Sequence, residues 1–453
     1  MIALSTPTPV AENGAVRPTI QAERVTTIDI LRGVALLGIL LMNIVLFALP
    51  PALFREQVFA HPGDTNYWVY LITNVLFEGK MRAVFSLLFG AGVLLFTSGK
   101  EAASEGSIVV ADLYYRRMLW LIVFGLVDAF LLLWFGDILY GYGLVGLLLF
   151  AFRNAAPRRL LLGALLCFAF HLFLNWWDFA ETGEKRQKYL AAVALEKQHK
   201  TLTEAQQGDK VAWEDMLKGR QFNQKKVDKE IKAMRGNYGS VWHQIRPRSV
   251  FYESELFYRF LIWDALGMML LGMALFKWGV LTNRVSSRTY WGMVVLGYGI
   301  GIPLGWWSVV QQADLYQNAA QAVDTQWFPA PGGTYDIRRT LVALGHIGVI
   351  MLLYRSGLFS GLWRPLSAVG QMAFTNYVMQ TLLCTGIFYG YGLGYYGALP
   401  YYQLYYVVPG IWALQLIISP IWLQNFRFGP LEWVWRSLTY WQRQPMRRTA
   451  GLH

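Results

Sequence analysis

The sequence predicts an all-α, polytopic integral membrane protein with about ten transmembrane helices and both termini in the cytoplasm. Of its 453 residues, 55% are hydrophobic, 16% are aromatic and only 15% are charged, whereas soluble domains carry about 25% charged residues. Lys and Arg (40) outnumber Asp and Glu (28), which gives a net charge of +12. Because basic residues collect in the cytoplasmic loops of membrane proteins, this excess favours membrane topology over nucleic-acid binding.

Ten apolar runs account for the predicted spans, since a spanning helix needs about 20 mostly apolar residues. They cover residues 30–50, 83–98, 118–135, 138–152, 160–178, 256–278, 290–310, 338–354, 366–389 and 404–425. A shorter run at 66–79 is amphipathic, so we expect it at the membrane interface or as a half-span. In the second span, Gly90, Ala91 and Gly92 form a patch of small residues that permits close helix packing.

Basic residues between the runs set the predicted orientation. Arg116 and Arg117 precede the third run, and further basic clusters follow the fourth, sixth, eighth and tenth runs. An even number of spans with both ends inside places all these clusters on the cytoplasmic side, which agrees with the positive-inside rule.

Polar stretches divide the chain into predicted parts. Residues 181–250 are rich in Lys, Glu and Gln, with sparse apolar positions at amphipathic helical spacing. Five spans precede them, so they are predicted to form an extracytoplasmic insert. The parts are a disordered cytoplasmic tail (1–27), an N-terminal bundle of about five spans (28–180), the insert (181–250), a C-terminal bundle of about five spans (251–426), and a basic cytoplasmic interfacial helix with a tail (427–453).

Five short motifs are more specific than hydropathy. They are DILRGVALLGILLMNI at 29–44, FSLLFGAG at 85–92, GDIL at 136–139 with Tyr142 and Gly146, GQMAFTNY at 370–377 with Gln380, and FGPLEWVWRSLTY at 428–440. Together they resemble the YeiB family of bacterial inner-membrane proteins, a family of unknown function. The resemblance covers nearly the whole chain apart from the tail and the insert, and it implies the bacterial cytoplasmic (inner) membrane as location. In that family the third span often carries His where this chain has Asp128.

The first helix and the next span also resemble transmembrane acyltransferases, including the acyltransferase-3 proteins and heparan-alpha-glucosaminide N-acetyltransferase. This resemblance implies transfer of an acyl group from a cytoplasmic donor such as acetyl-CoA to an acceptor on the far side. It also implies a catalytic site of Asn43 and His61, with His61 as general base and Asp64 orienting it. The alternatives are an interhelical hydrogen bond for Asn43 and an ordinary surface-loop role for His61.

Asp29 and Arg32 lie three residues apart at the cytoplasmic start of the first helix. One interpretation is a helix-end ion pair, because Asp suits the positive N-terminal end of a helix. The other is a donor-binding site, since Arg is well suited to the phosphates of a donor such as CoA.

Polar residues inside the apolar runs predict a polar cavity, because ionisable groups at membrane depth need a partner or water. For Asp128 the candidate partners are His171, Arg259 and Asp264. Asp137 lies in a tight turn and has a structural alternative, and Asn376 and Gln380 share a helix face where they could instead join helices. The predicted cavity residues are Asp128, Asp137, His171, Asn376 and Gln380.

The leading functional hypothesis is a membrane-embedded acyltransferase acting on a periplasmic or lipid-linked acceptor, with acetyl-CoA as donor and no tightly bound cofactor. A transporter or flippase of a small or amphipathic solute is the main alternative, and a scaffold that binds a partner through 181–250 is a third. Cys167 and Cys384 lie in apolar runs and predict no metal site. The expected partners are the bilayer and a small-molecule or glycolipid acceptor, without nucleic acid, and a homo-oligomer is left open.

Overall fold

The computed structural model describes residues 25–101, 107–326 and 328–448. Within these ranges the chain folds into helices joined by turns, and the β-structure is limited to one isolated bridge between Phe426 and Arg447. The all-α prediction is therefore confirmed. The predicted disordered tail lies outside the described residues as far as position 24.

The helices follow the predicted runs closely. The first half contains α1 (Thr26–Ala48), α2 (Pro51–Phe59), α3 (Thr65–Leu76), α4 (Lys80–Glu101), α5 (Ser107–Phe130), α6 (Leu139–Leu149), η2 (Phe150–Phe152), α7 (Pro157–Lys197), α8 (Glu204–Arg220) and α9 (Gln224–Met234). The second half contains α10 (Tyr238–Phe251), the π-helix η3 (Tyr252–Leu261), α11 (Ile262–Lys277), α12 (Ser287–Gln317), α13 (Ala319–Thr325), α14 (Ala330–Gly333), α15 (Tyr335–Ser356), α16 (Ser360–Gln371), α17 (Ala373–Phe388), η4 (Tyr401–Gln403), α18 (Leu404–Asn425) and α19 (Pro430–Tyr440).

Several helical segments are suited to a bilayer. Within the described ranges, seven helical segments are long and apolar enough to cross a membrane. They are Thr26–Ala48, Thr65–Ser98, Pro157–Lys197, Tyr238–Lys277, Ser287–Gln317, Tyr335–Ser356 and Tyr401–Asn425. The predicted spans at 118–135, 138–152 and 366–389 correspond to α5, to the short α6 and to the pair α16 and α17, which is interrupted at Met372. The chain is thus a polytopic membrane protein, while the count of ten and the cytoplasmic termini stay predictions.

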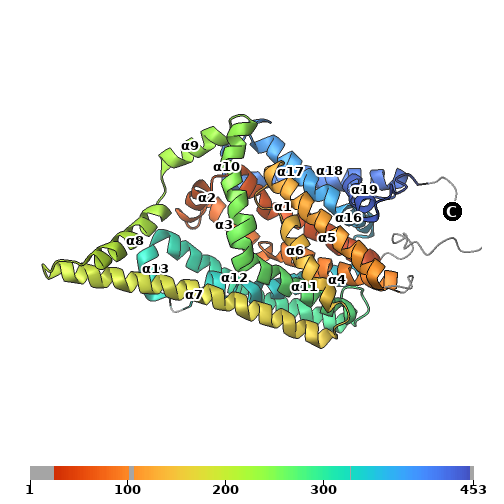
Figure 1. Cartoon of the computed structure of the whole chain (residues 1–453), viewed down its shortest axis with the longest axis horizontal. Coiled ribbons are helices and arrows are strands. Elements are labelled where there is room, and N and C mark those ends of the chain that lie inside the picture. Colours follow the sequence, from red (N-terminus) through yellow and green to blue (C-terminus); the bar gives the residue numbers. More distant parts are fainter. Residues whose placement is uncertain (1–24, 102–106, 327, 449–453) are drawn as a thin grey trace, which may run out of the picture.

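Two helices are much longer than the sequence predicts. α7 runs for 41 residues through the predicted boundary at 180, and α10, η3 and α11 form one continuous segment (Tyr238–Lys277). Beyond its apolar part, α7 is supported by ion pairs four residues apart, Glu181 with Lys185 and Glu184 with Lys188. In Figure 1, α7 extends beyond the bundle, α8 packs against its far end, and α9 leads to the top of α10.

Glycines allow the closest helix contacts of the bundle. Along the α1–α16 contact, a side chain at Gly33 would collide with the Leu366 carbonyl, and one at Gly370 with the Asp29 carbonyl. Between α4 and α11, a side chain at Gly90 would collide with the backbone of Met269. The small-residue patch in the second span therefore does what its composition predicts, which is to let two helix backbones approach closely.

Replacing Gly90 by Ala should destabilise the protein by about 1–3 kcal/mol, because the added methyl group must displace the α11 backbone. Gly92→Ala is the matched control two positions away, where a Cβ has no neighbour within 4 Å. We expect the control to be neutral or slightly stabilising, since Ala is the better helix former by about 1 kcal/mol. The measurement is thermal unfolding of detergent-purified protein, and equal melting temperatures for the two variants would contradict the assigned packing.

Candidate functional site

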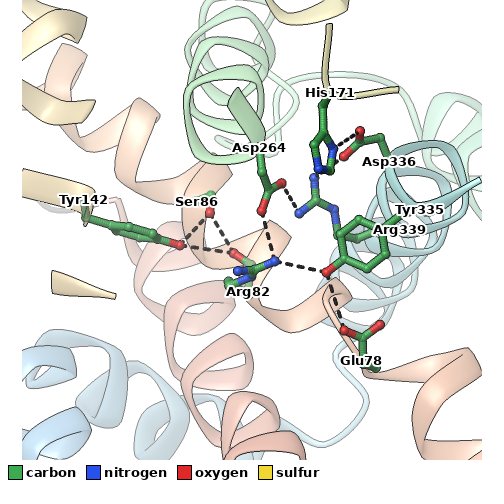
Figure 2. Close-up of polar contacts among 9 residues, drawn as sticks. All are labelled: Glu78, Arg82, Ser86, Tyr142, His171, Asp264, Tyr335, Asp336 and Arg339. Carbon is green, nitrogen blue, oxygen red and sulfur yellow. Dashed lines mark hydrogen bonds and ion pairs between the residues drawn. The ribbon is translucent and has the colours of Figure 1, made fainter. Parts of the chain in front are cut away.

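Charged side chains from four helices meet inside the bundle, as Figure 2 shows. His171 of α7 lies with Nδ1 2.6 Å from Asp336 Oδ2 at the start of α15. Arg339 donates from Nη2 to Asp336 Oδ1 (2.9 Å) and also pairs with Asp264 of α11. Asp264 in turn accepts from Arg82 of α4, with Nη2 2.9 Å from Oδ2. We call these five residues the interior ion network, and their link is continuous from α7 to α4.

The network is buried among apolar helices. Arg339 is 1% exposed, and Asp264, Asp336 and His171 are also buried. Charges at such depth persist only when they are paired, because desolvation costs several kcal/mol per ion. Each carboxylate in the network accepts from two partners, so the ions compensate one another.

Local structure brings these side chains together. Asp336 and Arg339 are three residues apart and share one face of the first turns of α15. Between α3 and α4 the chain turns at Gly79, whose φ of 72° suits Gly, and a side chain there would collide with Tyr335 and Arg339. This close approach carries Arg82 into the interior, where Nη2 donates to the Tyr335 hydroxyl at 3.0 Å.

His171 has the arrangement of a general base. A carboxylate can only accept, so Nδ1 of His171 carries the hydrogen that Asp336 binds. The other ring nitrogen, Nε2, makes no hydrogen bond to the described part of the chain. Such a pair fixes the ring orientation and leaves Nε2 able to take a proton from a bound group.

A cavity of about 210 Å³ lies one helical turn along α7 from His171, and its lining includes neither His171 nor Asp336. Asn175, one helical turn after His171, lines the cavity and donates from Nδ2 to the His171 carbonyl at 2.8 Å. Pro331, another lining residue, accepts from Arg338 Nη2 at 3.1 Å. Through these two lining residues the cavity is linked to the His171 backbone and to Arg338, and not to the side chains of the His171–Asp336 pair. Its polar lining side chains are Asn175, Asp178, Thr182, Arg220 and Gln326.

Asp128 and Asp137 belong to a second polar cluster. Tyr377 of α17 donates to Asp137 Oδ1 at 3.2 Å and accepts from Trp134 Nε1 at 3.1 Å. Thr381, one turn further on, donates to Asp128 Oδ2 at 3.4 Å. Both carboxylates thus face α17.

The three partners expected for Asp128 are wrong, because each is engaged elsewhere. His171 binds Asp336, and Arg259 pairs with Asp178. Asp264 pairs with Arg82 and Arg339. In the described ranges no group of three His, Cys, Asp or Glu side chains is arranged to hold a metal ion.

Asn376 and Gln380 connect α17 to α18. Asn376 Nδ2 donates to Ser419 Oγ at 2.9 Å, and its carbonyl accepts from Gln415 Nε2 at 2.8 Å. Gln380 Nε2 donates to Gln415 Oε1 at 3.0 Å. Of the two interpretations for this pair, these bonds favour interhelical packing.

The residues implied by the acyltransferase resemblance are not joined to one another. Asn43 is half-buried on α1, whereas His61 and Asp64 are exposed between α2 and α3. No hydrogen bond links these three side chains in the part of the chain that is described. Their catalytic role stays a prediction.

Asp29 and Arg32 form the ion pair that one interpretation expects, with Arg32 Nη1 3.0 Å from Asp29 Oδ1. Asp29 is buried against α16, and the Arg32 side chain is 26% exposed. The contact agrees with the helix-end ion pair, and the donor-binding role of these two residues stays a prediction.

Tyr335, Asp336 and Arg339 are not among the site residues predicted from the sequence. The available signal was their position: three polar side chains cluster where an apolar run begins, with Asp and Arg at helical spacing.

Two of the five motifs meet at Glu432. This residue of α19 accepts from the backbone N–H groups of Phe374 (2.7 Å) and Thr375 (3.1 Å) and from the Thr375 hydroxyl (2.5 Å). It thereby caps the N-terminus of α17. Burial raises the pKa of Glu432, while the hydrogen bonds from Thr375 and Phe374 oppose that rise.

Glu432→Ala should destabilise the protein by about 1–3 kcal/mol, because it leaves the first N–H groups of α17 without an acceptor. Glu181→Ala removes an exposed carboxylate that pairs with Lys185 and should change stability by less than about 1 kcal/mol. Guanidinium chloride unfolding followed by Trp fluorescence compares them. A loss no larger than that of the Glu181 variant would argue against the capping role.

The fold and the ion network define a class: an α-helical polytopic membrane protein with a charged interior site. The chain belongs to the YeiB family. It is 30% identical to uncharacterized protein YxaH of Bacillus subtilis (strain 168) over 95% of this chain and 98% of that protein. It is 30% identical to uncharacterized protein YeiB of Escherichia coli (strain K12) over 92% of this chain and 96% of that protein.

Further comparisons agree with this assignment. Residues 275–442 match the family described as protein of unknown function (DUF418). An uncharacterized 39.9 kDa protein in the amylase 3' region of Bacillus acidopullulyticus is 25% identical over 94% of this chain and 96% of its own length. No solved structure matches.

Proposed function

We propose that this chain is an acyltransferase of the bacterial inner membrane, with His171 as its general base. It would move an acyl group, such as acetyl from acetyl-CoA, to a periplasmic or lipid-linked acceptor. The observation that carries the proposal is the buried His171–Asp336 pair. An acceptor hydroxyl or amine needs a base of this kind to become a nucleophile.

The residues supply the parts that acyl transfer requires. Nε2 of His171 takes the acceptor proton as the acceptor attacks the acyl carbonyl, and the same nitrogen returns that proton to the leaving thiolate. Asp336 stabilises the imidazolium between these steps, because it already binds Nδ1. The guanidinium of Arg339, shared by Asp336 and Asp264, adds positive potential where the carbonyl oxygen becomes negative.

Arg32 would bind the acyl donor. Its exposed N–H groups at the start of α1 would bind a phosphate of the donor, while Asp29 holds the side chain in place. Asn43 lies between this end and the outer loop, so it would be a contact on the donor's path. His61 and Asp64 remain as a competing base and its orienting group, and a variant comparison separates the two sites.

The test is transfer of labelled acetyl groups from acetyl-CoA by purified protein in nanodiscs that contain bacterial lipids and glycolipid extract. We expect label in an extractable acceptor and saturable donor binding by calorimetry. Nanodiscs of the same composition without the protein are the control for non-enzymatic acetylation. Failure of both donor binding and transfer contradicts the proposal.

A transporter or flippase is the second candidate, because two helices are interrupted inside the bundle. The first break lies between α3 and α4 at residues 77–79, and the second lies at Met372 between α16 and α17. Discontinuous helices commonly form the substrate sites of transporters. Gradient-dependent solute uptake into proteoliposomes, without any acyl transfer, would favour this candidate.

A further inference from the structure

Two buried cations beside the interior ion network have no ionic partner in the described ranges. Lys80 is fully buried, and its Nζ donates to the Asn74 carbonyl at 2.6 Å. Arg338 is 4% exposed, and its Nη2 donates to the Pro331 carbonyl at 3.1 Å. Both bonds go to neutral carbonyl groups, so neither positive charge is balanced by them.

The nearby carboxylates are already occupied. Asp264 binds Arg82 and Arg339, and Asp336 binds Arg339 and His171. Glu78, the remaining acid, receives only a long contact of 3.5 Å from the Tyr335 hydroxyl and forms no ion pair with Lys80 or Arg338. Glu78 nevertheless acts electrostatically on Lys80, so the two cations and this carboxylate leave one net positive charge where an unpaired ion is costly.

Unused hydrogen-bonding atoms point to the same conclusion. Nε and Nη1 of Arg338 are buried without a hydrogen-bond partner, and so is the acceptor Oδ1 of Asn74. Lys80 and Arg338 also lie close enough for their charges to repel each other. Buried N–H donors without partners are rare in folded proteins, so such a cluster indicates a bound group that accepts hydrogen bonds.

We propose that Lys80 and Arg338 bind a phosphate group, either free or carried by a lipid headgroup. A phosphate offsets the net positive charge and offers more acceptor oxygens than a carboxylate, which suits three nitrogens with spare N–H groups: Lys80 Nζ and Arg338 Nε and Nη1. Several phosphate oxygens can accept from Lys80 and from both free nitrogens of Arg338, and Asn74 Oδ1 can accept from a hydroxyl of the ligand. This inference goes beyond acyl transfer and does not depend on it, because its readout is binding.

The first measurement uses the full-length wild-type protein in detergent. Its melting temperature should rise saturably with inorganic phosphate and stay unchanged with chloride or acetate at equal ionic strength and pH. In nanodiscs, phosphatidylglycerol added to phosphatidylcholine should give the same stabilisation if a lipid headgroup is the natural source. Absence of a specific shift with both phosphate and phosphatidylglycerol overturns the proposal without any variant.

Variants then assign the effect to the two cations. Lys80→Met and Arg338→Met should each weaken phosphate binding about tenfold or more, since each removes a charge-assisted hydrogen bond. Lys218→Met, which removes an exposed lysine of α8, should keep wild-type affinity. In phosphate-free buffer we expect the Lys80 variant to melt at or above the wild-type temperature, because an uncompensated buried charge is gone. Unchanged phosphate affinity in both variants contradicts the proposed site.

Discussion

Replacing Asp264 by Ala should destabilise the protein by about 3–5 kcal/mol, enough to prevent recovery of folded material. Asp264 is the carboxylate that joins Arg82 to Arg339, and it is 4% exposed. Its removal leaves the part-buried Arg82 without a carboxylate and the buried Arg339 with Asp336 alone. Breaking a buried ion pair by removing one partner costs this much because the other charge stays desolvated.

The control breaks an ion pair of similar chemistry at the surface. Asp112→Ala removes the partner of Arg116 on α5, where the two side chains are 49% and 33% exposed. We expect a change below about 1 kcal/mol, since water replaces the lost contact. Size-exclusion chromatography and thermal unfolding in detergent measure both variants. An Asp264 variant as stable as the Asp112 variant would show that the network is hydrated.

A triple variant tests the charge argument directly. Replacing Asp264, Arg82 and Arg339 together by Leu, Met and Met removes these three ions at once, and Asp336 keeps His171 as its partner. Stability should then recover relative to Asp264→Ala alone, because apolar side chains of similar volume often substitute well for buried ion pairs. If stability does not recover, the loss of stability in the Asp264→Ala variant comes from packing around α11 and not from the unpaired charges.

The sequence predicts the helices well because lipid exposure imposes long apolar runs. Each of the ten predicted spans corresponds to helix, although α5 ends at Phe130 before a turn. Helix ends are harder to predict where polar residues also favour helix. Residues 181–197 continue α7 through ion pairs such as Glu181 with Lys185, so a change in composition there marks no break. The break at Met372 has no Pro or Gly at that position to announce it.

The candidate site is less predictable because its members lie far apart in sequence. His171 and Asp336 are 165 residues apart, and Arg82 lies before both. Only the packing of α7, α11, α4 and α15 brings them together. The family motifs carry different information: the α1 motif packs on the α16–α17 motif through Gly33 and Gly370, and the last motif caps α17 through Glu432. Those motifs therefore specify helix contacts more than chemistry.

His171→Ala should lower acyl transfer by about 10²–10⁴-fold while the protein remains folded. Positioned general bases contribute this much to rate, and His171 holds its Nδ1 hydrogen on Asp336 so that Nε2 can act. His61→Ala is measured in the same assay, because His61, exposed in the loop between α2 and α3, is the competing base. Labelled transfer from acetyl-CoA in nanodiscs gives the rates, and the melting temperature of each variant checks its fold.

The pattern of losses distinguishes the two candidate bases. Asp336→Asn should also reduce transfer, because an amide can bind Nδ1 in the wrong tautomer and cannot stabilise the imidazolium. If His61→Ala and Asp64→Ala abolish transfer while His171→Ala leaves it intact, catalysis takes place at the outer loop and the interior pair is structural. Loss of activity only in the His171 and Asp336 variants would assign the proton transfer to the interior pair.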